Sequence, residues 1–196
     1  MLEEKFEKIL TSEKPSRLIK ENEEYIFNLI PDLKKCKGFN QNNRWHIYDV
    51  YEHTLHVMDG VPKDLTYRLA ALFHDLGKPY VYTEDKDGIG HFYRHWVKSN
   101  EIFNEFSKRN QLDEKMTNTI TKLIAYHDIN LGKINKEEEE KIAHTFSKEE
   151  LLMLFKLKRS DLLAQNPLYH NMLKDYHEQE SKLLKEYYKD DEDYER

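Results

Sequence analysis

The sequence lacks the residues that define several protein classes. Cys36 is its only cysteine, which excludes a disulfide framework and a zinc site built on cysteines. No apolar run approaches the roughly 20 residues of a membrane span, and the acidic N-terminal segment MLEEKFEKIL is unlike a signal peptide. A single cysteine and no membrane segment are typical of a reducing compartment. We therefore expect a cytoplasmic protein with no membrane partner.

Motifs for several kinds of chemistry are also absent. No glycine-rich loop is present to hold phosphates, which argues against a P-loop nucleoside triphosphatase. No serine stands in a nucleophile elbow. The net charge of -6 argues mildly against a protein that coats nucleic acid non-specifically. The 196 residues suit one domain with a modest core under a heavily charged surface.

Helical periodicity dominates the sequence that remains. It predicts helices at about 2–10, 15–30, 49–60, 62–76, 94–109, 113–127, 136–145, 148–164 and 167–196. Residues 31–48 are expected to form a loop. The segment 80–93 alternates like strands around Asp87-Gly88, which predicts a small β-hairpin. The expected fold class is therefore all-α, in one domain over 1–196, with one small β-hairpin insert.

One of these helices carries an unexpected polar pair. In the stretch LAALFHDLGKP, residues 69–79, His74 and Asp75 stand in the last turn of an otherwise apolar helix. Because burying an unpaired imidazole or carboxylate is costly, a partner is needed elsewhere in the chain. Gly77 and Pro79 end the helix, and we expect Pro79 to begin the hairpin.

Three more polar residues fall on apolar helix faces. Residues three, four and seven apart share a face, which aligns His53, His127 and Asp161 with valines, isoleucines or leucines. His56 instead falls on a polar face, where we expect it to be exposed. Each inward residue alone is more often a satisfied core residue, but so many in one small domain point to a common partner. Three imidazoles and two carboxylates are a ligand set for a divalent metal ion.

The motifs that carry these residues resemble a known family. YDVYEHTLHV, LAALFHDLGKPYVYTEDKDGIGHFYRH, YHD and KRSDLLAQNP resemble the HD-domain metal-dependent phosphohydrolases. The similarity is closest to the HD domain of bacterial CCA-adding tRNA nucleotidyltransferases. It covers about 44–167, between N-terminal helices within 1–40 and a polar C-terminal helix at 168–196. The nucleotidyltransferase head has no counterpart, so we do not expect polymerising activity.

The resemblance implies a set of site residues. The ligands of a first metal ion would be His53, His74, Asp75 and Asp161. In two-metal members Asp75 would bridge to a second ion held by His95 and His127. One or two divalent ions are therefore expected, drawn from Mn, Mg, Ni, Co, Fe and Zn. Lys78 matches a family lysine near the substrate phosphate, so the expected catalytic residues are Asp75 and Lys78.

Some positions depart from the family pattern or lie beside it. Arg94 stands where the family often has glycine, and it could contact phosphate through its guanidinium group. Helical phase places His95 beside Lys98 and Ser99 rather than on an apolar stripe, which leaves the number of metal ions open. His46 and His91 border the expected site. Each either binds phosphate or protonates the leaving oxygen, or has a structural or solvent-exposed role.

The chemistry that the resemblance implies is hydrolysis of a phosphate ester by metal-activated water. The expected partner is a small phosphorylated substrate: a nucleotide monophosphate, a 2′,3′-cyclic nucleotide, or the terminal phosphate of an RNA end. Five aromatic residues near the expected site either pack in the core and hairpin, which is the commoner role, or stack a base: Trp45, Tyr48, Phe92, Tyr93 and Trp96. The alternative is a non-catalytic, metal-containing module that binds RNA or protein. No particular protein partner can be inferred.

Overall fold

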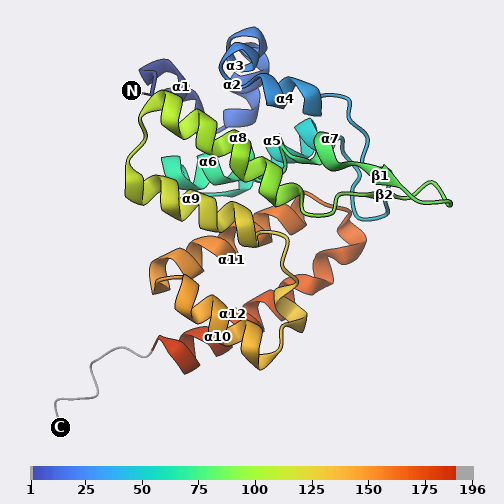
Figure 1. Ribbon diagram of the computed structural model, residues 1–196, viewed down its shortest axis with the longest axis vertical. Coiled ribbons are helices and arrows are strands. Elements are labelled where there is room, and N and C mark those ends of the chain that lie inside the picture. The colour runs from blue at the N-terminus through green and yellow to red at the C-terminus, as the bar shows by residue number, and fades with distance from the viewer. Residues whose placement is uncertain (1, 189–196) are drawn as a thin grey trace.

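Helices make up most of the computed structural model, which describes residues 2–188 (Figure 1). The first half contains α1 (Glu4–Leu10), α2 (Pro15–Glu21), α3 (Glu23–Leu29), α4 (Pro31–Cys36), α5 (Val50–Gly60), α6 (Leu65–Phe73) and α7 (Lys78–Val81). Two short strands follow, β1 (Thr83–Glu84) and β2 (Gly90–His91). The second half contains α8 (His95–Asn110), α9 (Glu114–Tyr126), η1 (Leu131–Lys133), α10 (Lys136–Thr145), α11 (Lys148–Leu163), η2 (Pro167–Met172) and α12 (Leu173–Tyr187). The all-α fold with one small hairpin is confirmed.

Five helices form the centre of the molecule. α8 packs along α9, α9 along α6, and α11 along α5 (Figure 1). Side-chain caps fix where several of these helices begin: Asp49 accepts from the backbone N–H of Glu52 before α5, and Ser147 accepts from that of Glu150 before α11. The helices bury their leucine, isoleucine, valine and phenylalanine faces against each other. The interior ends of the helices therefore lie close together.

The N-terminal segment is more broken than its periodicity predicts. The single helix expected over 15–30 is wrong, because Asn22 leaves the helical conformation between α2 and α3, and its side-chain amide donates to Leu18 O at 2.9 Å. The loop expected over 31–48 begins with a helix instead. Pro31 is the first residue of α4, a position where its fixed φ and missing N–H are favourable.

The segment after His74 also differs from expectation. α6 ends at Phe73, and His74 and Asp75 lie in the turn that follows. Pro79 does not begin the hairpin but lies in α7, and the two strands pair over two residues each, with Thr83 opposite His91. Gly77 has an ordinary φ of -76°, yet a Cβ there would lie 2.2 Å from His95 O. Its missing side chain allows α8 to approach closely.

The C-terminal helices form a separate layer at the bottom of Figure 1. The buried carboxylate of Glu139 on α10 accepts from Lys182 at 2.5 Å and Gln179 at 2.9 Å, both on α12. The single helix expected from Pro167 begins instead with η2, and residues 189–196 of the expected polar helix lie outside the described residues. Among residues 2–188, no helix has the length and apolar character needed to cross a membrane.

Candidate metal centre

The polar residues that helical phase placed inward meet at the interior ends of the central helices. His53 lies on α5, His74 and Asp75 follow α6, His127 caps α9 and Asp161 lies on α11. All but Asp161 are buried, and 14% of the Asp161 side chain is exposed. His56, one turn after His53 on α5, is exposed as expected and stacks on Tyr48. The structure therefore brings the inward set together at one place.

His95 joins this cluster although its helical phase is not apolar. It is the first residue of α8 and is buried. Ser99, one turn later on the same helix, is also buried and faces Gly77. The Ser99 hydroxyl accepts from the Gly77 N–H at 2.9 Å. The interior at this point is thus formed by the backbone of another segment, which the periodicity of α8 could not reveal.

Asp75 lies at the centre, and its two carboxylate oxygens face different histidines. Oδ2 lies 3.2 Å from His74 Nε2 and 3.4 Å from His53 Nε2. Oδ1 lies 3.1 Å from His95 Nε2 and 3.4 Å from His127 Nε2. Asp161 Oδ1 adds a further oxygen 2.9 Å from His53 Nε2. The cluster therefore has two halves that share one carboxylate.

Each of the four histidines presents the same ring nitrogen to the cluster. Their Nδ1 atoms face backbone carbonyls: Ala164 O at 3.3 Å from His53, Ala71 O at 2.7 Å from His74, Phe92 O at 2.9 Å from His95, and Ile124 O at 2.7 Å from His127. An Nδ1–H that donates to a carbonyl fixes the tautomer and leaves the Nε2 lone pair for a metal ion. The backbone thus prepares all four rings as ligands.

These lone pairs have no adequate partner within the protein. The buried Nε2 atoms of His53 and His74, and Oδ1 of Asp75, form no hydrogen bond among the described residues. His95 Nε2 and His127 Nε2 lie 3.0 Å apart, which brings two acceptors together unless a proton or a cation lies near them. Unsatisfied buried polar atoms are uncommon in folded proteins. A divalent cation would satisfy these atoms together.

The charges of the cluster favour an ionised Asp75. Burial alone would raise the pKa of its carboxyl group, but the charge that His74 has when its Nε2 carries a proton rather than a metal ion, and the charge of Lys78, hold that pKa well below its usual range. Burial lowers the pKa of His74, whereas the charge of Asp75 raises it, and the net change is upward.

Three sets of side chains could each hold a metal ion, because their candidate ligand atoms lie within 4.8 Å of one another: His53–His74–Asp161, His74–Asp75–His127 and His46–His53–Asp75. These residues fit a divalent metal ion.

Lys78 is buried beside Asp75. Its Nζ lies 2.7 Å from Asp75 Oδ2, 2.8 Å from Gln41 Oε1 and 3.4 Å from His46 Nε2. Each N–H of the ammonium therefore has an acceptor within the protein. Sequence reasoning missed Gln41, which lies in a loop where no periodicity marks a buried residue.

The other expected substrate contacts lie around this core. His46 accepts from Lys78 while its Nδ1 faces Asn43 Oδ1 at 2.9 Å, and burial with the charge of Lys78 lowers its pKa to about 2. His91 pairs with Asp85 at 3.1 Å. Arg94 is exposed before α8 at a φ of +59°, a conformation that favours glycine.

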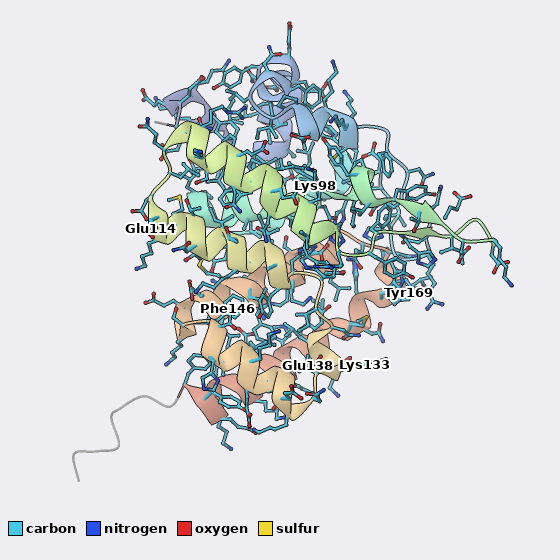
Figure 2. All side chains as sticks on the ribbon, viewed as in Figure 1. Lys98, Glu114, Lys133, Glu138, Phe146 and Tyr169 are labelled. Carbon is cyan, nitrogen blue, oxygen red and sulfur yellow. The ribbon has the colours of Figure 1, made fainter. Side chains whose placement is uncertain are left out.

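Two pockets border the cluster, and His46 and Asp128 line both. The first, called the hairpin pocket, has a volume of about 320 Å³ and is lined by Lys78, His91, Arg94, His95, Phe92, Tyr93 and Trp96. The second, called the α11 pocket, has a volume of about 210 Å³ and is lined by residues that include His127, Asp161, Lys158, Tyr176 and Trp45. Trp45 packs on Tyr169, with ring centroids 3.9 Å apart. Figure 2 labels Tyr169.

Lys158 in the α11 pocket is a second residue that sequence reasoning missed. It is buried one turn before Asp161 on α11, and its Nζ donates to His127 O at 2.5 Å. Burial lowers its pKa to about 8. Helical phase could have found it, because a residue three positions before Asp161 shares that residue's face.

Comparison with known proteins assigns the family. The HD domain model matches residues 46–146, which is just over half of the chain. The match includes His53, His74, Asp75, His95 and His127 and ends before Asp161. No curated protein matches the chain. With a match of this extent and a buried cluster of histidines and aspartates that could hold a metal ion, the chain belongs to the HD-domain family, whose members are generally metal-dependent hydrolases.

Proposed function

We propose that this protein is a phosphohydrolase that uses two divalent metal ions to cleave a phosphate ester. The observation that carries the proposal is the position of Asp75, each of whose oxygens faces two imidazole Nε2 atoms. His53, His74, Asp75 and Asp161 would hold one ion, and Asp75, His95 and His127 the other. When bound, such ions supply an activated water and neutralise phosphoryl charge.

The chain's own residues would orient the nucleophile and the substrate. Asp75, held as a carboxylate by Lys78, is the central acceptor that orients the attacking water. Arg94 lines the hairpin pocket with an exposed guanidinium that can bind a phosphate through two hydrogen bonds. His91, paired with Asp85, lies in the same pocket and is placed to donate a proton to a leaving oxygen.

The lining of the hairpin pocket favours a nucleotide as substrate. Phe92, Tyr93 and Trp96 line it, and Tyr93 is largely exposed with its ring stacked on His91 at 5.4 Å. Stacking of a base on an aromatic ring contributes about 1–3 kcal/mol. The proposed substrates are a nucleotide monophosphate, a 2′,3′-cyclic nucleotide or a terminal RNA phosphate. The likeness of the sequence motifs to the HD domain of CCA-adding enzymes supports the RNA connection.

A phosphatase screen tests this function. Purified protein is incubated with each substrate class in the presence of Mn, Mg, Ni, Co, Fe or Zn. We expect release of phosphate or opening of the cyclic ester with at least one metal, and loss of activity in Asp75→Asn. His56→Ala is the matched control, because His56 lies on α5 near His53 but is exposed. Wild-type protein that binds metal stoichiometrically yet hydrolyses nothing would refute the enzyme and favour the metal-containing binding module.

A further inference from the structure

The two buried lysines beside the cluster differ in how their N–H groups are used. Lys78 has acceptors for all three: Asp75 Oδ2, Gln41 Oε1 and His46 Nε2. Lys158 has one hydrogen-bond acceptor within residues 2–188, the carbonyl of His127 at 2.5 Å. Two of its N–H groups therefore remain available, and they belong to a side chain that lines the α11 pocket.

Among residues 2–188, only weaker attractions stabilise a cation at this position: the charges of Asp161 and Asp128 and the ring of Tyr176. The ring of Tyr176 lies 5.4 Å from Lys158 Nζ, and neither Asp128 nor Asp161 comes within ion-pair distance of it among the described residues. Burying an ammonium group with one hydrogen bond is unfavourable, and lysine is rarely found fully buried without a partner. An anion in the pocket would give this ammonium the acceptors that the protein does not provide.

The position of Lys158 next to the cluster indicates which kind of anion would bind there. It lies one helical turn from Asp161 and donates to the backbone of His127, so it adjoins residues from both halves of the cluster. An oxyanion that reaches the ions proposed for those halves from the α11 pocket would lie beside Lys158. Hydrogen bonds from an ammonium to a phosphate are charge-assisted and about twice as strong as neutral ones.

We propose that Lys158 binds the phosphoryl oxygens of the substrate in the α11 pocket, whereas Lys78 holds Asp75 in place. The inference rests on the proposed function, because it assumes that a phosphate ester is the ligand. His46 and Asp128 line both pockets, so the phosphate would lie where the pockets meet, with Lys158 on the α11 side, Arg94 on the hairpin side and the esterified group in the hairpin pocket. Asp128 and Asp161 give the α11 pocket a negative lining, so phosphate binding also requires the metal ions.

The test measures the binding of inorganic phosphate to manganese-loaded full-length protein by calorimetry. Lys158→Met keeps the unbranched side chain up to the ε position and removes the charged Nζ. We expect its affinity for phosphate to fall at least tenfold, with manganese per chain unchanged. Lys158→Gln removes the charge but keeps an N–H donor one bond closer to the backbone, so it separates the loss of charge from the loss of any donor to His127 O, and we expect the same weakening.

Each outcome decides the proposal. Wild-type affinity for phosphate in Lys158→Met or Lys158→Gln overturns it. Loss of manganese in both variants overturns it too, because Lys158 would then act only by supporting His127. Weakened phosphate binding in a protein that hydrolyses no phosphate ester keeps Lys158 as the anion-binding residue and refutes the proposed function instead. Hydrolysis with a KM unaffected by either substitution refutes the role of Lys158 alone.

Discussion

Replacing Gly77 with alanine tests how α8 delivers His95 to the cluster. The added Cβ would lie 2.2 Å from His95 O and 2.7 Å from Ser99 N. Real Cβ contacts essentially never fall below 3.0 Å, so the His95 carbonyl must withdraw by about 0.8 Å, the difference between 3.0 and 2.2 Å. The φ of Gly77 suits alanine, so the effect arises from the contact and not from backbone strain.

This displacement acts on a ring held within narrow limits. His95 Nε2 lies 3.1 Å from Asp75 Oδ1 and 3.0 Å from His127 Nε2. Overpacking of this kind costs about 1–3 kcal/mol in the free energy of unfolding. We also expect Gly77→Ala to lose the metal ion proposed for His95 and His127 while it keeps the one proposed for His53 and Asp161.

Urea unfolding and elemental analysis of metal per chain measure the two effects. Gly132→Ala is the control, because its nearest contact would be Asp175 Cβ at 3.1 Å, outside the cluster. The control should keep the metal content and lose little stability. Wild-type stability and metal content in Gly77→Ala would refute the reasoning, because the close approach of α8 would then not determine where His95 lies.

Three further predictions concern the metal and the acid stability of the fold. His53→Ala should lower the metal content by at least one ion per chain, whereas His56→Ala should retain it; equal losses in elemental analysis would contradict the assignment. Chelation should lower the melting temperature, since an ion present at a hundred times its Kd stabilises the fold by about 2.7 kcal/mol, and an unchanged calorimetric transition would argue against bound metal. Burial raises the pKa of Glu139, but the hydrogen bonds from Lys182 and Gln179 lower it by more, so the net pKa lies below its ordinary 4.5. Its contribution to stability is thus complete above pH 4.5 and is lost as the pH falls through the lower folded value, so Glu139→Gln should flatten urea-measured stability over that window, and an unchanged slope would refute this.

Helical phase was sufficient to find the residues whose neighbours lie on the same helix. His53, His127 and Asp161 each align with apolar residues of their own helix, and the structure brings them together. Their position depends on a periodicity that the sequence displays directly. The all-α class and most of the long helices follow from the same signal.

The residues that phase could not find depend on contacts between distant segments. His95 is buried because Gly77 and Ser99 allow close packing, and Gln41 is buried in a loop that meets Lys78. The break between α2 and α3 at Asn22 depends on a local side-chain hydrogen bond that competes with the helix. Helical periodicity carries no information about contacts between distant segments or about a local side-chain hydrogen bond of this kind.

The spread of the cluster along the chain has a consequence for folding. Its residues extend from His53 on α5 to Asp161 on α11, and the segments that carry them are far apart in sequence. An ion held at both ends closes long loops at once, and such closures cost entropy that grows only slowly with loop length. The metal would then act as a cross-link between remote helices. Without the metal, amide hydrogen exchange should accelerate around His53 in α5 and around Asp161 in α11 before the rest of the fold opens.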